Sequence, residues 1–353
     1  MFQQSLYQTY HRFKSLQTHF ITTLPIVILM PHSACNCKCI MCDIWKGNNN
    51  IRSLTELDII DLLFALKELQ TKQVVLSGGE ALLHSNFFNL CNLLKKEGLS
   101  LTLLSTGISL EKYASELVHT VDEIILSLDG DEKTHNRIRN IPTAFQKLRN
   151  GINAILSFNP NFNLSVRTVV HKHNYKILNN IINTAKSLNV KSISFLPADV
   201  TSNAFNRSVV WNQEKQSDIL IPFTELHFLH EIIEKVIMQH QSDFENRFIV
   251  ESPDKLRKIY TYYSAQYGLN EFPYKKCNAP WVSAVIEPDG NVKPCFFHAA
   301  VGNIKSNNLM EIINNEHSIQ FRKNLNVDEN HTCKKCVCYL NLKPHINPVA
   351  KRI

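Results

Sequence analysis

The sequence predicts a parallel α/β fold followed by a small cysteine-rich module. Residues 22–200 repeat a short apolar run, a polar or glycine-containing turn and a helical stretch. This alternation is typical of a parallel sheet covered by helices. The pattern stops near residue 277, and five of the ten cysteines lie beyond that point. Six repeating units can form an open sheet or a partly closed barrel, and periodicity does not choose between them.

Six strands are expected in the repeating part of the chain. Each is rich in Val, Ile and Leu with little alternation, as in parallel strands that are buried on both faces. The expected strands are Pro25–Met30, Gln73–Ser77, Leu101–Ser105, Glu123–Leu128, Asn163–Val169 and Ser192–Leu196. The segments between them carry helix signals, such as the capping box that Ser53 and Glu56 are expected to form.

The chain is expected to divide into five parts. These are a helical extension (1–21), the α/β core (22–215), a helical bridge (216–276), the cysteine-rich α+β module (277–345) and a tail (346–353). Within the module, Trp281 to Cys295 should form a hairpin that turns at Pro288-Asp289-Gly290. A single helix should follow from Asn308 to Leu325.

Three cysteines follow the first expected strand with a Cys-x3-Cys-x2-Cys spacing, at Cys35, Cys39 and Cys42. Three thiolates on so short a loop cannot form a complete set of disulfides, but they can bind three irons of a [4Fe–4S] cluster. The fourth iron then has no protein ligand, which points to a reactive cluster. The alternative is a zinc site that His32 or Cys37 would complete.

Glycines and polar residues follow the later strands, where parallel folds concentrate their chemistry. Gly78, Gly79 and Glu80 follow the second strand, and Thr106 follows the third. Glycine lets the backbone approach a ligand closely, and a carboxylate accepts charged hydrogen bonds. The fourth strand ends at Ser127-Leu-Asp129.

The cysteine spacing together with Gly78-Gly79-Glu80 resembles the radical S-adenosylmethionine superfamily, over about residues 22–200. The resemblance implies a partial (β/α)6 barrel similar to a TIM barrel. It also implies that Cys35, Cys39 and Cys42 hold the catalytic [4Fe–4S] cluster, whose fourth iron binds S-adenosylmethionine. Reductive cleavage of that cofactor would yield a 5′-deoxyadenosyl radical that abstracts hydrogen from a substrate.

The same resemblance implies a set of contacts to the cofactor. They would come from Gly78, Gly79, Glu80, Thr106, Ser127, Asp129 and Arg139. The sequence departs from the family pattern at Met41, where an aromatic residue is frequent, and at Ala81, where proline is frequent. Both residues keep an apolar or small character.

The C-terminal cysteines resemble the twitch domain, a shorter relative of the SPASM extension. The residues that carry this resemblance are Cys277, Gly290-x4-Cys295 and Cys333-x2-Cys336. Four such cysteines imply an auxiliary [4Fe–4S] cluster, with Cys338 as the alternative to Cys336. Zinc is a competing occupant, since Cys-x2-Cys is common in zinc sites.

The resemblance implies an oxidoreductase, or another radical-based modifying enzyme, that acts on a small molecule or a peptide. An external one-electron reductant such as flavodoxin or ferredoxin would supply the electron that starts the reaction. The alternative is a non-catalytic iron–sulfur electron carrier or a cysteine-rich zinc-binding scaffold.

The charge and hydropathy argue against other partners. The formal net charge is +7, but seven thiolates holding two clusters would reduce it to about +4. No basic run stands out, so a nucleic-acid partner is not favoured. No apolar run reaches the ~20 residues of a membrane helix, and the N-terminus lacks the order of a secretory signal. A cytoplasmic location is the resulting expectation.

Overall fold

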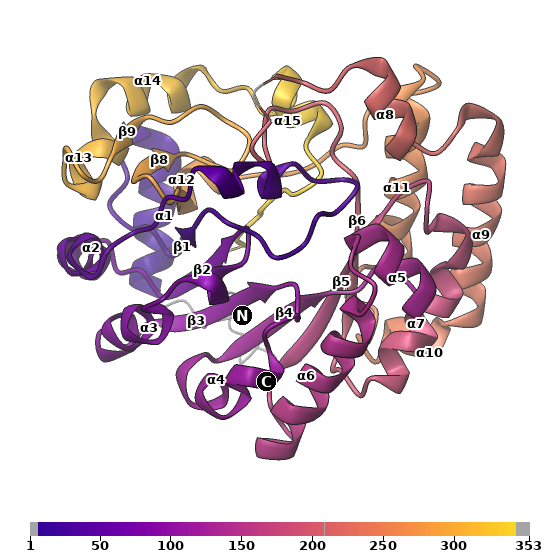
Figure 1. The fold of residues 1–353 in the computed structure, drawn as a ribbon. Coiled ribbons are helices and arrows are strands. Elements are labelled where there is room, and N and C mark those ends of the chain that lie inside the picture. The colour runs from indigo at the N-terminus through magenta and orange to yellow at the C-terminus, as the bar shows by residue number, and fades with distance from the viewer. Residues whose placement is uncertain (1–5, 208, 344–353) are drawn as a thin grey trace, which may run out of the picture.

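The computed structural model describes residues 6–207 and 209–343 and shows an open, curved sheet with helices on its outer side (Figure 1). The sheet has nine strands in the order β6-β5-β4-β3-β2-β1-β7-β8-β9. Its first six strands are β1 (Ile26–His32), β2 (Gln73–Gly78), β3 (Ser100–Ser105), β4 (Glu123–Ser127), β5 (Leu164–Val170) and β6 (Ile193–Pro197).

Neighbouring strands from β1 to β6 all pair in parallel. Each lies within two residues of its expected bounds, and the predicted α/β partial barrel is confirmed. The helices that alternate with the strands are α2 (Glu56–Glu68), α3 (Phe87–Lys96), α4 (Ala114–Thr120), α5 (Glu132–Arg139), α6 (Ala144–Phe158) and α7 (Leu178–Ser187). Short 3-10 helices occur at Ile44–Asn49, Ala81–Leu83, Glu111–Tyr113, Tyr175–Ile177 and Phe223–Glu225.

The first helix of the barrel begins two residues later than the sequence suggests. The N-cap of α2 is Thr55, whose hydroxyl accepts from the Asp58 N–H while the Asp58 carboxylate accepts from the Thr55 N–H. The expected capping box from Ser53 to Glu56 is therefore wrong. The hydroxyl of Ser53 instead bonds to Nδ1 of His32 at 2.7 Å, which ties this loop to the end of β1.

The cysteine-rich part continues the sheet of the barrel. Strand β7 (Ser283–Ile286) pairs in parallel with β1, and β8 (Asn291–Lys293) and β9 (Gly302–Asn303) follow antiparallel. The expected hairpin is present, with Gly290 at a φ of +89° in its turn. A residue without a Cβ meets no steric penalty in that conformation.

The expected helix from Asn308 to Leu325 is two helices, α13 (Leu309–Asn314) and α14 (Glu316–Asn324). They separate at Asn315, whose side-chain oxygen accepts from the Ser318 N–H at 2.7 Å and caps α14. Asparagine favours such caps over helix interiors because its side chain competes for backbone groups.

The remaining helices lie before, beside and within the cysteine-rich part. They are α1 (Leu6–Thr18), α8 (Gln213–Ile219), α9 (Leu226–Gln239), α10 (Gln241–Glu245), α11 (Pro253–Gln266), α12 (Ala279–Val282) and α15 (His331–Lys335). Helix α8 runs across the expected boundary between residues 215 and 216. The expected tail at 346–353 lies outside the described residues, as do 1–5 of the extension and 344–345 of the module.

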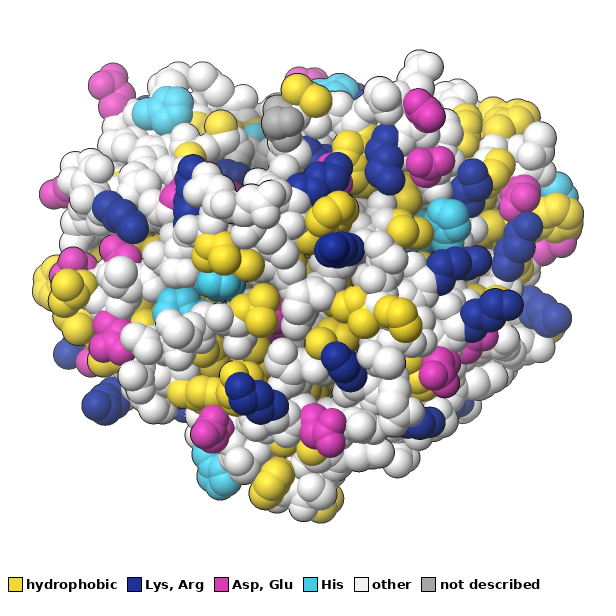
Figure 2. All heavy atoms as spheres, in the orientation of Figure 1, with side chains coloured by type: hydrophobic (Ala, Val, Ile, Leu, Met, Phe, Trp, Pro, Cys, Tyr) yellow, Lys and Arg dark blue, Asp and Glu magenta, His cyan; other side chains and the backbone are white. Residues whose placement is uncertain are grey.

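Among the described residues, none of the helices is both long and apolar enough to cross a membrane. Figure 2 shows Lys and Arg side chains interspersed with Asp and Glu side chains over one face of the molecule. This mixture of signs on that face agrees with the modest net charge inferred from the sequence.

Candidate functional site

The loop that carries the first three cysteines lies directly against the turn after β2. The Glu80 N–H donates to the Ala34 carbonyl at 2.9 Å. A Cβ on Gly79 would lie 2.3 Å from that same carbonyl oxygen, and one on Gly78 would lie 2.8 Å from the His32 oxygen. Two glycines are therefore required for this turn to meet the backbone that leads into Cys35.

Asn48 holds the backbone of the first cysteine from the other side. Its side-chain oxygen accepts from the Cys35 N–H at 3.0 Å, and its amide nitrogen donates to the Cys35 carbonyl at 2.9 Å. Further along the loop, Lys38 and Ile40 donate backbone hydrogen bonds to the end of α5, at Arg139 and Ile138. The loop is thus fixed on several sides by residues distant in sequence.

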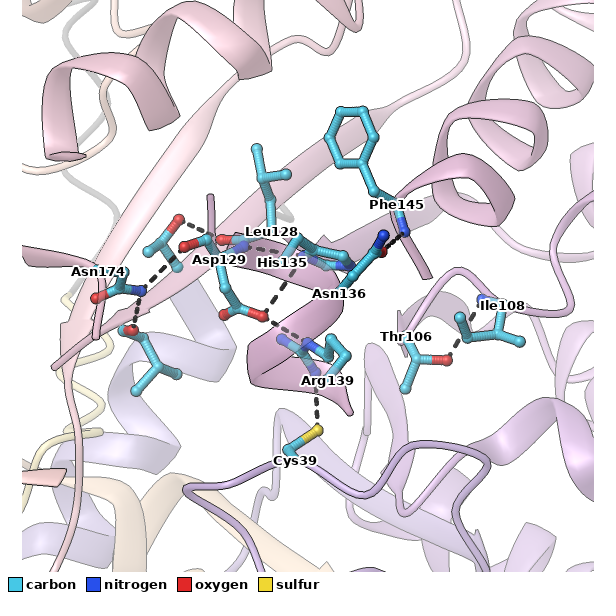
Figure 3. A network of polar contacts seen from close by, with 12 residues as sticks. Cys39, Thr106, Ile108, Leu128, Asp129, His135, Asn136, Arg139, Phe145 and Asn174 are labelled. Carbon is cyan, nitrogen blue, oxygen red and sulfur yellow. Dashed lines mark hydrogen bonds and ion pairs between the residues drawn. The ribbon is translucent and has the colours of Figure 1, made fainter. Parts of the chain in front are cut away.

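Arg139 lies between the cysteine loop and the end of β4 (Figure 3). Its Nη1 is 3.5 Å from the sulfur of Cys39, and its Nε donates to Oδ2 of Asp129 at 2.5 Å. Both partners of this ion pair are buried. Burial alone would lower the pKa of Arg139, but Asp129 and Cys39 raise it well above its ordinary value.

His135 approaches the same carboxylate without forming an ion pair. Burial lowers the pKa of His135 to about 4, so the ring is neutral near pH 7. Its Nδ1 accepts the Asp129 N–H at 3.2 Å. Among the described residues, Oδ1 of Asp129 is buried and has no hydrogen-bond partner, which leaves one acceptor available beside the cysteine loop.

The thiols of the loop differ in how readily they ionise. A hydrogen bond from Cys37 lowers the pKa of Cys39 to about 7, and Arg139 acts in the same direction. Burial raises the pKa of Cys35 and that of Cys42 to about 12. Buried thiolates need a positive partner, which bound metal supplies. This donor set therefore fits an iron–sulfur cluster.

The Glu80 carboxylate joins the ends of β2 and β3. Its Oε2 accepts from the Thr106 N–H at 2.8 Å, from the Thr106 hydroxyl at 2.6 Å and from the Ser105 hydroxyl at 3.0 Å. From the part of the chain that the structure describes, Oε1 accepts one longer bond, of 3.3 Å, from the Leu82 N–H. Burial raises the pKa of Glu80. Ser105 ends an expected strand but was not among the expected cofactor contacts.

Ser127 stands at the end of β4, opposite Arg167 of β5 in the register of the sheet. The structure thus places the expected cofactor residues at neighbouring strand ends. Glu80 and Thr106 contact each other, and Asp129 and Arg139 form a second pair that reaches Cys39.

The five C-terminal cysteines line one cavity. They are Cys277, Cys295, Cys333, Cys336 and Cys338. Thiols that surround a cavity suit a multi-iron cluster, whose ligands bind different irons. Among the described residues, no three His, Cys, Asp or Glu side chains converge on a point where they could hold one metal ion, and a cluster does not require this because its cysteines bind different irons.

Two further residues of this cavity were missed by the sequence analysis. His298 places Nε2 at 3.4 Å from the sulfur of Cys333. The Lys275 ammonium donates to the backbone oxygens of Lys334 and Cys336 at 2.7 and 2.5 Å. Burial raises the pKa of Cys295 to about 11 and that of Cys333 to about 12.

Two aromatic residues, Trp211 and Phe205, each contact a residue next to one of the cysteine groups. The indole N–H of Trp211 donates to Asp43, next to Cys42, at 2.7 Å. The Phe205 ring lies 5.1 Å from that of Phe296, next to Cys295. Nothing in the local sequence pattern indicates these contacts.

Two family models match the chain. Residues 29–185 match the radical SAM superfamily, and residues 277–337 match SPASM, an iron–sulfur cluster-binding domain. The second match includes Cys336 and ends one residue before Cys338.

Three curated relatives match part of the chain. One is an S-adenosylmethionine-dependent nucleotide dehydratase of Fibrobacter sp. (strain UWH6), 26% identical over 40% of this chain and 46% of its own length. A second is a GTP 3′,8-cyclase of Petrotoga mobilis, 30% identical over 48% of this chain and 54% of its own length. The chain thus spans about half the length of these relatives.

Solved structures share the fold at low identity. Streptococcus suis SuiB bound to precursor peptide SuiA is 16% identical, with a TM-score of 0.64 over 95% of this chain and 78% of that one. anSMEcpe with bound AdoMet and the Cp18Cys peptide is 19% identical, with a TM-score of 0.61 over 89% of this chain and 86% of that one.

Proposed function

Because residues 29–185 match the radical SAM superfamily and residues 277–337 match a SPASM iron–sulfur cluster-binding domain, we propose that this chain is a radical enzyme. Cys35, Cys39 and Cys42 hold its catalytic [4Fe–4S] cluster, and S-adenosylmethionine binds beside it. The observation that carries this proposal is the close contact between the cysteine loop and the turn at Gly78 and Gly79.

When reduced and bound to S-adenosylmethionine, the cluster supplies the radical that abstracts hydrogen from substrate. The surrounding residues bind and orient. Thr106 and Ser105 hold the Glu80 carboxylate in place, which leaves Oε1 to accept from an ammonium group. Arg139 places a positive charge beside Cys39, and this favours a thiolate there. Glu80, Ser105, Thr106 and Arg139 are all buried, which limits the access of water to this side of the loop.

The C-terminal cavity holds a second [4Fe–4S] cluster in this proposal. Its ligands are Cys277, Cys295, Cys333 and Cys336, with Cys338 as the alternative to Cys336. Such a cluster would supply either an acceptor for the electron of the product radical or a binding site for the substrate. An external reductant of the flavodoxin or ferredoxin kind donates the electron that reduces the first cluster. The cytoplasm is the compartment that keeps these thiols reduced.

The substrate is a small molecule or a peptide. Two curated relatives are named for nucleotide or GTP chemistry, and a structural neighbour has a precursor peptide bound. These names support both substrate classes and do not separate them.

The test is anaerobic reconstitution with iron and sulfide, followed by dithionite and S-adenosylmethionine. We expect 5′-deoxyadenosine and about eight irons per chain, the content of two [4Fe–4S] clusters. Cys39→Ala should abolish 5′-deoxyadenosine formation, while Cys295→Ala should retain it and lose product. Cys91→Ala removes a buried thiol of α3 and is the control.

A wild-type chain that forms no 5′-deoxyadenosine would instead support the non-catalytic electron carrier. A content of about four irons and one zinc per chain would indicate that the second site holds zinc instead of a cluster.

A further inference from the structure

A second cavity lies between the barrel and the cysteine-rich part. It has a volume of about 200 Å³ and is lined by residues of β5, β6 and α11, by Lys275, and by residues 336–339, which include Cys336 and Cys338. No residue of the proposed cofactor site lines it.

The cavity begins one strand away from Ser127. Arg167 is paired in register with Ser127 on one side and with Ser194 on the other. Side chains paired in register lie on the same face of a sheet, and neighbouring strands are about 4.8 Å apart. Arg167 and Ser194 line the cavity, so it adjoins the proposed site of S-adenosylmethionine on this face.

The opposite wall belongs to the second cysteine group. Cys336 and Cys338 line both this cavity and the cavity of the five cysteines. A molecule in the second cavity would therefore lie beside the second proposed cluster.

The charged residues of the cavity are mostly cations. Four cationic side chains line it, Arg167, Lys255, Lys258 and Lys275, against the single carboxylate of Glu251. Glu251 accepts from the Phe195 N–H at 2.9 Å and has Lys255 at 3.5 Å. Lys255 is paired with Glu251, and Lys275 is bonded to backbone oxygens next to the second cysteine group. Among the described residues, Arg167 and Lys258 have no ion pair with a carboxylate, so their part of the cavity is complementary to an anion.

The cations retain donors for such an anion. Arg167 uses Nε to bond Ser194 at 3.1 Å, and among the described residues no hydrogen bond is formed by its two terminal nitrogens. Lys258 donates one bond, to the Tyr274 carbonyl at 2.9 Å, and an ammonium has three donors. Guanidinium groups match phosphate in a bidentate geometry.

We propose that this cavity binds the phosphate group of a phosphorylated small-molecule substrate. The inference rests on the proposed function, because it takes the cavity as the substrate site of that enzyme. The Arg167 fork and the Lys258 ammonium hold the phosphate, and the rest of the substrate extends along the row from Arg167 towards Ser127.

The test uses the reconstituted full chain and isothermal titration calorimetry with inorganic pyrophosphate. Cluster absorbance before and after titration shows that the iron is retained. We expect saturable binding at one site, weakened about tenfold or more in Arg167→Gln and in Lys258→Gln, since a hydrogen bond to a charged group is lost. Lys235→Gln, which neutralises an exposed lysine of α9, should bind as the wild type does.

Citrate, a carboxylate of similar charge, is the comparison ligand. The proposal is overturned if the wild type does not bind pyrophosphate at millimolar concentration, or if both cavity variants bind it normally. Equally tight citrate binding that depends on the same residues would assign the cavity to carboxylates and overturn the phosphate assignment. Two variants keep the test decisive if Arg167→Gln does not fold.

The 5′-deoxyadenosine assay separates this inference from the proposed function. A wild type that cleaves S-adenosylmethionine but does not bind pyrophosphate contradicts only the phosphate site. A wild type that does not cleave S-adenosylmethionine contradicts the enzyme itself.

Discussion

Arg139 and Cys39 are one hundred residues apart in sequence, yet Nη1 of the arginine lies 3.5 Å from the sulfur of the cysteine. Because the same guanidinium pairs with Asp129, it links the end of α5, the end of β4 and the cysteine loop. A change at Arg139 therefore affects the stability of the fold and the environment of Cys39 together.

Arg139→Ala should destabilise the chain by about 3–5 kcal/mol, because it leaves the buried Asp129 carboxylate without its partner. Adding Asp129→Asn should recover part of this loss, since the uncompensated charge is then removed. Urea unfolding of the single and double variants measures both effects. Arg257→Ala breaks an exposed pair with Glu234 and should have a much smaller effect. If Arg139→Ala and Arg257→Ala lower the free energy of unfolding equally, burial is not the cause of the large effect expected at Arg139.

Gly79→Ala should displace the cysteine loop, because its Cβ would lie 2.3 Å from the Ala34 oxygen. We expect a loss of about 1–3 kcal/mol of stability, as in other overpacked sites, and reduced iron at the first cluster. Gly98→Ala is the matched control. Gly98 has a φ of +75°, and no atom lies within 4 Å of the position of an added Cβ. The Gly98→Ala variant should therefore lose about 1 kcal/mol of stability and keep its iron. Normal iron content in Gly79→Ala would refute the steric argument.

Asn48→Ala should loosen the first cluster by freeing both backbone groups of Cys35. Two lost hydrogen bonds cost about 2 kcal/mol together, so the cluster should bleach faster in air than in the wild type. The decay of the visible cluster absorbance measures the rate. Asn50→Ala alters an exposed residue of the same asparagine run and serves as the comparison. If both variants bleach at the same rate, Asn48 has no special role.

Glu251 should make stability depend on pH. Burial raises the pKa of its carboxyl above the ordinary value of 4.5. Between 4.5 and the raised pKa, the folded chain therefore binds more protons than the unfolded chain, and stability falls as pH rises. Glutamine does not ionise, so Glu251→Gln should not show this fall in stability as pH rises.

The thermal unfolding midpoint of Glu251→Gln relative to the wild type should therefore increase from pH 5 upwards. Glu231→Gln, at an exposed position of α9, is the control. A difference between Glu251→Gln and the wild type that stays constant with pH would contradict the buried carboxyl as its source.

The sequence predicts the six barrel strands well because each is a continuous apolar run with a turn signal at its end. The structure also places Gly78, Gly79 and Glu80 against the loop of Cys35. Their proximity could be expected because carboxyl ends of neighbouring parallel strands meet at one edge of a sheet.

The contacts that fix the site were not predictable in the same way. Trp211 and Asp43 are 168 residues apart, and a tryptophan in an irregular segment carries no local sign of its partner. Asn48 belongs to a run of three asparagines that resembles an ordinary loop. The sequence does not show that Ser53 is not a helix cap, because its hydroxyl forms a hydrogen bond to His32, a tertiary contact that only the fold reveals.

The pairing of β7 with β1 has a consequence for dissecting this protein. Strand β1 holds Ile26, Val27, Ile28 and Leu29 in register with β7. Removing residues 277–343 would expose a long apolar strand edge, which is prone to pair with other chains. The N-terminal part prepared alone should therefore aggregate. The two cysteine groups are built on one hydrogen-bonded sheet, so deleting one of them also removes structural support from the other.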